Sequence, residues 1–587
     1  MTPPTAPTPP GLARGPSARL MGSSASVDAL ERLRAELSAQ KTARITPLLE
    51  RAVREIKAHR PEKAAELAIE ALQIDERFGI AWHVLAIAQE GRGDFANSLS
   101  CYEAALALLP EDKEIVINLG RLAFRMGMPE TAEKLFRHFL AWHPDHAEAV
   151  NNLALAMRAQ ERMDEAMEIL QGFLTRLPMH ANIWNSLGTM VAEKGDIANA
   201  ELFYREALRL DPAMARARYN MGNLWLNIGE TERALEEVED ALKVPLAADE
   251  KAMMTLTRGL ARLALGEVSA GWRDYEARND INFPEGTYFA MEGPRWSPGQ
   301  SIEGKSLLLI GEQGLGDEVA FANIIEDVLA RLGEHGHLTF AVEPRLVSLF
   351  SRSFPSATIE GHRTVNISGR TVRLVPALEK SDRGIDCWSP MASLFQDLRP
   401  DSGSFPEKTG YLHPDPLRVE HWRRILADLP AAPRIGLLWK SAVLAAGRQR
   451  HFSSFEAWEP VLRTPGVTFV NLQYGDCEAE LQLARERFGV EIWNPPGIDL
   501  KQDLDDVTAL SCAMDLIIGF SNATFNLAAA AGAPVWLISA KGAWTPLGTD
   551  RYPWYPQARL YRPKAYAEWG PVLQQVADDL AVAFPRA

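Results

Sequence analysis

The pattern of hydrophobic and polar positions changes once along the chain. Up to about residue 282 it repeats in 34-residue blocks, each with two amphipathic segments of helix length, and four prolines keep this spacing at Pro110, Pro144, Pro178 and Pro212. From residue 305 onward, short apolar runs without strict alternation are separated by amphipathic segments. The first pattern predicts stacked helix pairs, and the second predicts buried parallel strands with helices between them.

The 34-residue blocks carry the large and small residues of the tetratricopeptide repeat (TPR). In the block that begins at Gly79, these positions hold Trp82, Leu85, Ala86, Tyr102, Ala105 and Pro110. Small residues let two helices approach closely, and proline starts the turn into the next block because it cannot continue a helix. The pattern therefore predicts a TPR α-solenoid of about seven helical pairs, an architecture that typically holds another protein.

Asparagines occupy matching places in several blocks. Asn118, Asn152 and Asn220 share the sixth position, and Asn185 lies one place out of register. An amide both donates and accepts hydrogen bonds, so such a row can grip an extended peptide backbone without reading its side chains. Two alternatives stay open: that these residues only solvate the groove, and that the array binds a folded or helical surface.

Apolar runs in the second part of the chain predict two doubly wound α/β units, whose ligands bind at the carboxyl ends of the strands. These runs are Ser306–Ile310, Leu338–Val342, Ile435–Trp439, Thr468–Leu472, Leu516–Phe520 and Val535–Ile538. Residues 400–433, rich in proline, glycine and charge, predict a link between the units. The predicted domains are a disordered proline-rich tail (1–27), the solenoid (28–283), a linker (284–304) and two Rossmann-like units (305–415 and 416–587).

A glycine-rich loop, GEQGLGD at residues 311–317, lies between the first predicted strand and a predicted helix. Gly314 and Gly316 allow a tight turn, and a loop in this place usually handles a phosphate or a reacting group. Asp317 is a candidate general base that takes the proton of an attacking hydroxyl, with Glu312 in reserve. A carboxylate at this place also caps a helix, and that alternative stays open.

Two elements of the second unit favour an anion. A strand that ends near Lys440 is followed by a basic loop with Arg448 and Arg450, whose cations can neutralise a departing phosphate. The first turn of a later predicted helix offers free N–H groups to an anion; it consists of Ser521, Asn522, Ala523 and Thr524. The alternatives are a solvated basic loop and ordinary helix caps.

Composition narrows the possible partners. The net charge of -15 over 587 residues argues against nucleic acid as the main partner, because phosphate backbones need a basic surface. The four cysteines are scattered without a CxxC pair, so we expect neither a zinc site nor a disulfide framework, and a reducing cytoplasm fits. No apolar run reaches the length of a membrane span, and the first residues lack a signal-peptide core.

Four stretches, together with the repeats, carry a family resemblance. They are GWRDYEAR (271–278), GPRWSPGQSIEGKSLLLIGEQGLGDEVAFANII (293–325), DLIIGFSNATFNLAAAAGAPVWLIS (515–539) and YPWYPQARLY (552–561). The chain resembles bacterial TPR proteins that end in a glycosyltransferase of the GT-B type. Within that group it is most similar to the flagellin-modifying glycosyltransferases of polar-flagellated bacteria, and the match covers nearly the whole chain beyond the tail.

The resemblance implies a function. Such enzymes transfer a nonulosonic acid, of the pseudaminic or legionaminic type, from a CMP-activated donor to serine or threonine of flagellin, with flagellin docked on the TPR half. Flagellum assembly and motility would depend on this transfer. The resemblance to heptosyltransferase-like enzymes also implies Asp317 as the base, donor-phosphate contacts at Lys440 and at the start of the 521–531 helix, and no bound metal or other cofactor.

The sequence departs from these relatives at the donor site. They commonly have aspartate and threonine where this chain has Ser521 and Asn522, and histidine where it has Asn526. The loss of the aspartate is compatible with a donor sugar that carries its own carboxylate, since like charges repel. Two other functions stay open: a transferase that uses UDP-N-acetylglucosamine or another UDP-hexose, and a non-enzymatic TPR adaptor or flagellin chaperone with a degenerate transferase half.

Overall fold

The structure is a computed structural model that describes residues 24–58, 60–367, 370–380, 384–440 and 452–585. The chain divides into two compact units, Met1–Met190 and Val191–Ala587. The division falls inside α9 (Ala181–Glu193), so the later helical repeats belong to the same unit as all of the described strands.

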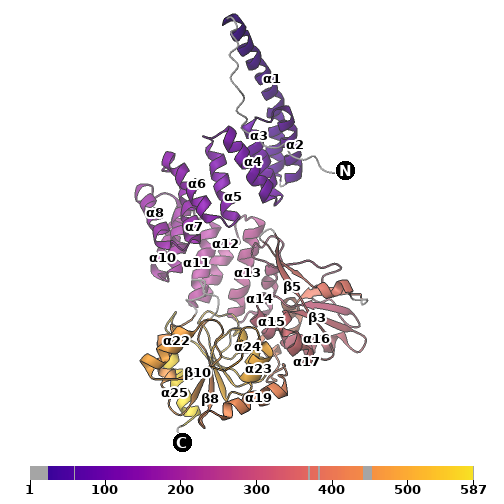
Figure 1. Cartoon of the computed structure of the whole chain (residues 1–587), viewed down its shortest axis with the longest axis vertical. Helices are drawn as coiled ribbons and strands as arrows, with labels where there is room; N and C mark the ends of the chain where they lie inside the picture. The colour runs from indigo at the N-terminus through magenta and orange to yellow at the C-terminus, as the bar shows by residue number, and fades with distance from the viewer. Residues whose placement is uncertain (1–23, 59, 368–369, 381–383, 441–451, 586–587) are drawn as a thin grey trace. The chain divides into compact units, whose positions relative to one another are not determined.

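Unit 1 consists of successive antiparallel helix pairs (Figure 1). Before α9 its helices are α1 (Ser24–Lys57), α2 (Pro61–Ile74), α3 (Gly79–Gly91), α4 (Phe95–Leu108), α5 (Lys113–Arg125), α6 (Pro129–Trp142), α7 (Ala147–Ala159) and α8 (Met163–Arg176). Alanines pack at the helix contacts of the first pairs, together with buried Trp82 and Tyr102. The predicted TPR helical solenoid is therefore confirmed.

The repeats continue into unit 2. Their helices there are α10 (Ile197–Leu210), α11 (Ala215–Ile228), α12 (Thr231–Ala241), α13 (Ala248–Ala264) and α14 (Val268–Tyr275), followed by the 3-10 turn η1 (Glu276–Asn279). Successive helices of this series pack against each other.

The turn inside each repeat needs a left-handed residue, a feature that the sequence pattern did not bring out. Gly93, Gly127, Gly195 and Gly229 have φ between 74° and 85°, and in the repeat between Gly127 and Gly195 this place is taken by Glu161, with φ 62°. Glutamate in this conformation brings its Cβ close to the following carbonyl oxygen, whereas glycine has no Cβ.

We expect Glu161→Gly to stabilise unit 1 by up to about 1 kcal/mol, because removing the Cβ relieves the left-handed strain and only part of the gain is lost to the more flexible unfolded chain. Glu161 is exposed, so no packing is lost. Thermal unfolding of the full chain measures the effect, and Gly127→Ala is the matched control, which should lower the melting temperature. A melting temperature that falls in Glu161→Gly would contradict the strain at this turn.

The first sheet of unit 2 is parallel, with the order β4-β3-β2-β7. Its strands are β2 (Ser306–Ile310), β3 (His337–Val342), β4 (Thr358–Gly361) and β7 (Cys387–Pro390), and its helices are α15 (Leu315–Phe321), α16 (Ile325–Leu332), α17 (Val347–Ser353) and α18 (Phe395–Leu398). A small separate sheet has the order β1-β6-β5, with β1 (Tyr288–Phe289), β5 (Arg363–Ile367) and β6 (Arg370–Leu374).

The second sheet is parallel throughout, with the order β10-β9-β8-β11-β12-β13. Its strands are β8 (Arg434–Leu438), β9 (Thr468–Asn471), β10 (Ile492–Trp493), β11 (Leu516–Phe520), β12 (Val535–Ile538) and β13 (Arg559–Tyr561). The chain leaves β8 toward one edge of the sheet and returns to its other side at β11. The topology therefore reverses between these two strands, at the place where open α/β sheets bind ligands.

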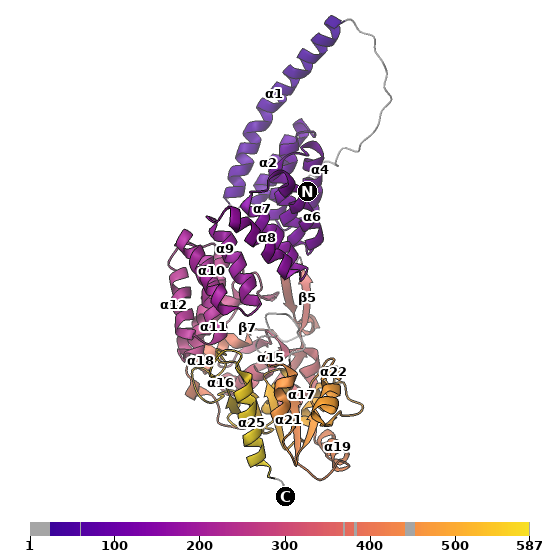
Figure 2. The same cartoon turned by 90° about the vertical axis from the view of Figure 1, so that its left-hand side faces the viewer.

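Helices cover both faces of the second sheet. One group contains α19 (Pro416–Ala427), α23 (Leu504–Ser511) and α24 (Ala523–Ala530), and the other contains α21 (Glu459–Leu462), α22 (Glu478–Leu483) and α25 (Trp569–Ala583). Figure 2 shows the second group on the side of the sheet turned toward the viewer. All six apolar runs singled out in the sequence form strands, within one residue at either end.

One hydrophobic core joins the parts of unit 2. It contains Trp272 and Tyr275 from α14, Leu307 from the first sheet, Ile517 from the second, and Phe525 from α24. The last repeats and both sheets therefore pack as one body.

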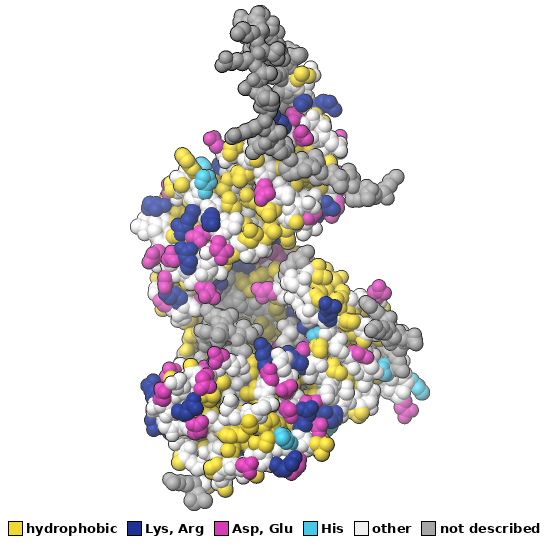
Figure 3. Space-filling model, in the orientation of Figure 1, with side chains coloured by type: hydrophobic (Ala, Val, Ile, Leu, Met, Phe, Trp, Pro, Cys, Tyr) yellow, Lys and Arg dark blue, Asp and Glu magenta, His cyan; other side chains and the backbone are white. Residues whose placement is uncertain are grey.

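The surface of the repeats carries exposed hydrophobic side chains. Trp142, at the end of α6, is 76% exposed, and Figure 3 shows hydrophobic side chains gathered on the surface of the repeats. Among the described residues, none of the helices combines the length and the apolar character that crossing a bilayer requires.

Candidate functional site

The glycine-rich loop and the predicted anion-binding turn meet. A Cβ atom at Gly316 would lie 3.4 Å from both the backbone N and the Cα of Ala523, and 3.2 Å from Nδ2 of Asn526. Because such distances are tight for an added methyl group, Gly316 lets the start of α15 approach the start of α24. The two sheets thus bring their candidate loops, 311–317 and 521–526, into direct contact.

Asp317 lies in the first turn of α15. Its Oδ2 accepts a hydrogen bond from the N–H of Gly314 at 3.1 Å, so the capping contact considered from the sequence is present. Burial raises the pKa of Tyr275, of Tyr555 and of Tyr552, the last to about 12, and the negative charge of Asp317 adds to each increase. The charge of the Asp317 carboxylate therefore acts on three buried phenol groups.

Tyr552 links this group to the second sheet. Burial raises the pKa of its hydroxyl, and the nearby side chains of Thr545 and Ser521 lower it. Ser521 directly follows β11. A chain of polar groups thus connects the neighbourhood of Asp317 with the carboxyl end of β11.

Glu312 is engaged elsewhere. It is 2% exposed, and its carboxylate forms a bidentate ion pair with the buried Arg278, at 2.7 Å to Nε and 2.8 Å to Nη2. The N–H of Ala392 donates a third hydrogen bond at 2.6 Å. Both oxygens of the Glu312 carboxylate are thus occupied by buried partners. Its reserve role as a base stays a prediction.

The other residues proposed at the start of α24 mainly stabilise the first turn of this helix. Oδ1 of Asn522 accepts the N–H of Phe525 at 2.9 Å, which is an N-cap. Asn526 is buried, accepts a hydrogen bond from the Tyr555 hydroxyl at 3.0 Å and donates to the Asn522 carbonyl at 2.9 Å. Thr524 is also buried. Of this set, Ser521 lies in the cavity described next.

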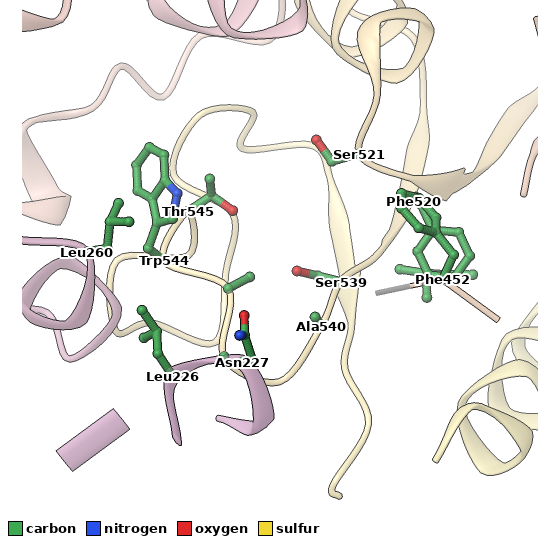
Figure 4. A pocket seen from close by; sticks show the side chains of 13 residues that line it. Leu226, Asn227, Leu260, Phe452, Phe520, Ser521, Ser539, Ala540, Trp544 and Thr545 are labelled. Atoms are coloured by element: carbon green, nitrogen blue, oxygen red, sulfur yellow. The ribbon is translucent and has the colours of Figure 1, made fainter. Parts of the chain in front are cut away.

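A cavity of about 340 Å³ opens at the carboxyl ends of β11 and β12 (Figure 4). Phe520 and Ser521 lie at the end of one strand, and Ile538 and Ser539 at the end of the other. The loop after β12 contributes Ala540 and residues 542–545. The remaining wall comes from Phe452 and from the repeats, with Leu226 and Asn227 of α11 and Leu260 of α13. Sequence reasoning missed this contribution from the helices.

The loop after β12 lies against two turns of the repeats. A Cβ atom at Gly542 would lie 2.0 Å from the carbonyl oxygen of Leu226, and one at Gly548 would lie 2.6 Å from the N and Cα of Gly266. Nζ of Lys541 also pairs with Glu230 at 2.9 Å. Backbone therefore rests on backbone at both ends of the loop, which fixes the cavity wall to the turns that follow α11 and α13.

Lys440 follows β8 but does not line this cavity. Its ammonium donates to the carbonyl of Asp476 at 2.7 Å and pairs with Glu480, while its N–H donates to Gln473 at 3.0 Å. Its assignment to the donor phosphate stays a prediction. Arg448 and Arg450 lie outside the described residues.

The four asparagines of the predicted peptide row differ in their contacts. Nδ2 of Asn118 hydrogen-bonds with Nε2 of His83 at 3.0 Å, and Asn185 is buried. Nδ2 of Asn152 is buried and has no hydrogen-bond partner among the described residues. Asn220 lies on α11 in unit 2. Peptide binding by these residues stays a prediction.

Comparison with known proteins places the chain in a family. Models of the tetratricopeptide repeat match residues 83–137, 117–178 and 191–245. Protein FlbA of Caulobacter vibrioides is 48% identical over 560 residues, which cover 95% of this chain and 94% of FlbA. The chain belongs to the FlbA family.

Other similarities of this FlbA-family chain are partial. Human protein O-mannosyl-transferase TMTC1 is 31% identical over 160 residues, 25% of this chain and 18% of TMTC1. Human TMTC3 is 23% identical over 197 residues, 31% of this chain and 21% of TMTC3. A solved TPR protein of Parabacteroides merdae is 18% identical and covers 40% of this chain and 91% of its own, but its TM-score of 0.34 is too low to carry an argument.

The packing of the loop on α11 can be tested in the FlbA-family chain with Gly542→Ala. We expect a loss of about 1–3 kcal/mol in the free energy of unfolding, because the added methyl group overlaps the backbone of Leu226. Gly570→Ala in α25 is the control, since no atom lies within 4 Å of its Cβ position. Thermal unfolding measures both variants, and equal melting temperatures would contradict the close packing.

Proposed function

We propose that this chain is a GT-B type protein O-glycosyltransferase, which transfers a nonulosonic acid from a CMP-activated donor to serine or threonine of flagellin. The observation that carries the proposal is the contact between the Asp317 loop and the Ser521 turn, formed across the carboxyl edges of two parallel sheets. It brings the loop that carries Asp317 next to the turn that contributes Ser521 to the cavity.

The strand orders support two nucleotide-type units. Numbered along the chain, the strands of the second sheet have the order 3-2-1-4-5-6, which is the order of dinucleotide-binding sheets, and those of the first sheet have the order 3-2-1-4. Lys440 follows β8 and Ser521 follows β11, the two strands on either side of the reversal. The sugar end of a donor nucleotide bound there would face the glycine-rich loop of the first sheet.

The relatives support the reaction class. The name FlbA has the form of a flagellar gene name, which favours flagellin as the acceptor. The TMTC proteins are named as protein O-mannosyl-transferases, so a protein hydroxyl as acceptor agrees with the partial similarity. The TPR repeats are an interaction module that would hold the protein acceptor.

The proposed reaction uses Asp317 as the general base. The carboxylate takes the proton of the acceptor hydroxyl while the hydroxyl oxygen bonds to the anomeric carbon of the donor sugar. The bond from that carbon to the phosphate of CMP breaks, and the electrons of this bond go to the phosphate. Lys440 would leave Glu480 to balance the charge on the departing phosphate. Ser521 in place of an aspartate leaves room for the carboxylate of the donor sugar.

A non-enzymatic adaptor is the second candidate, and two contacts favour it. Asp317 already accepts the N–H of Gly314, and Lys440 is already paired with Glu480, as in a degenerate transferase that keeps only its fold. A UDP-hexose transferase is the third candidate and shares the fold and base of the first.

Asp317→Asn separates the enzyme from the adaptor. Asparagine can still accept the Gly314 N–H, so the fold should persist, whereas transfer should fall by about 10²- to 10⁴-fold because the base is lost. Intact-mass spectrometry of flagellin from cells carrying the variant measures this loss. Glu312→Gln is the matched change at the reserve candidate. In contrast to Asp317→Asn, it should lower the melting temperature, because it weakens the buried pair with Arg278. If flagellin from cells with Asp317→Asn keeps the same modified mass as in the wild type, Asp317 is not the base.

The nucleotide can be identified by ligand stabilisation. A ligand that binds only the folded protein raises its melting temperature, by an amount that grows with concentration over Kd. We expect CMP to raise the melting temperature of the pure full chain more than UDP at equal concentration. A larger shift with UDP would favour the hexose transferase, and no shift with either nucleotide would count against both.

A further inference from the structure

Helix α11 carries three asparagines on one face. Asn220, Asn223 and Asn227 are spaced i, i+3 and i+7, so their side chains lie in one row along the helix. All three are partly exposed, while Met221 and Trp225 on the other side of the helix are buried. Among the residues that the structure describes, the amides of Asn223 and Asn227 have no hydrogen-bond partner. Two amides of this row are therefore available to a ligand.

The row ends in the cavity beside Ser521. Figure 4 shows the Asn227 side chain among the lining residues, together with Ser539 and Thr545. Among the described residues that line the cavity, none carries a charged side chain. A wall of hydroxyl, amide and apolar groups suits a neutral polypeptide segment better than a phosphate, which needs cations or free N–H groups.

The spacing of the amides suits an extended chain. Four residues of α-helix advance about 6 Å, so Asn223 and Asn227 lie about that far apart along α11. Two residues of an extended strand advance about 6.6 Å, and alternate residues point their N–H and C=O groups to the same side. Successive amides can therefore bond alternate peptide units, without any demand on the side chains of the ligand.

We propose that Asn223 and Asn227 guide an extended segment of the acceptor polypeptide along α11 into the cavity, where Asn227 holds the peptide backbone next to the serine or threonine to be modified. This inference rests on the proposed function and adds the path and the positioning residues of the acceptor. The last repeats of the solenoid are then part of the transfer site itself. The anchoring of the 540–548 loop on α11 keeps Asn227 in register with Ser521.

Kinetics of the full-length protein test this path. Each of Asn223→Ala and Asn227→Ala should raise the KM for flagellin by roughly two- to tenfold, the worth of one lost hydrogen bond, and leave the KM for the CMP-activated donor unchanged. The thermal shift caused by CMP should also stay as in the wild type. Glu236→Ala, an exposed position on α12, is the control and should change nothing. An unchanged flagellin KM in both asparagine variants would overturn the inference and leave the proposed function standing.

Crosslinking provides a readout that does not need transfer. Asn227→Cys, labelled with a benzophenone maleimide and irradiated with flagellin, should attach to a flagellin peptide that contains a modified serine or threonine. Cys101, Cys387 and Cys477 are buried, and burial raises the pKa of the partly exposed Cys512 to about 11, so the label should favour the new thiol. Glu236→Cys is the matched control, from which we expect no such attachment. Attachment at both positions alike, or at neither, would overturn the acceptor path. If wild-type protein neither responds to CMP nor modifies flagellin, the proposed function fails on its own.

Discussion

The structure of the candidate site depends on the contact between the 540–548 loop and the turns that follow α11 and α13. At Gly542 and Gly548 this contact leaves no room for a side chain, because backbone lies directly on backbone. The loop connects the second sheet to the aromatic cluster, in which Trp544 and Trp554 pack edge-on to Trp272 of α14. Without this contact, the cavity at the end of β11 would lose two of its walls.

A buried ion pair also holds the elements around the site in place. The buried Arg278, from the turn after α14, ties the last repeat to the first sheet through Glu312. A charge so far from water is tolerated only when it is paired and fully hydrogen-bonded, so the pair fixes the relative position of its two elements. Asp317, five residues later, remains near the cavity because its loop is held from both sides: by this ion pair and by α24 against Gly316.

Much of the fold could be predicted from the sequence. The strands β2, β8, β9, β11 and β12 are short runs of apolar residues because both of their faces are buried, and such runs are recognisable. β5, with the sequence RTVNI and an exposed surface, carries no such signal, and β10 has only two residues. For the site, the sequence singled out residues 311–317 and the turn at 521–524 as candidates, one in each α/β unit, and the structure brings them into contact. It did not reveal Asn227 or the pairing of Arg278 with Glu312, since a repeat pattern does not say which turn packs on a neighbouring sheet. The i, i+3, i+7 asparagines of α11 were the one available signal.

In the proposed reaction, the last repeats and the second sheet together form the transfer site. The most direct measurement is an experimental structure of the full chain with CMP and a serine-containing flagellin peptide bound. The account predicts CMP at the carboxyl edge of the second sheet between β8 and β11, with the peptide in the cavity between Asn227 and Ser521. CMP bound away from that edge, or a peptide seated elsewhere with the cavity vacant, would contradict it.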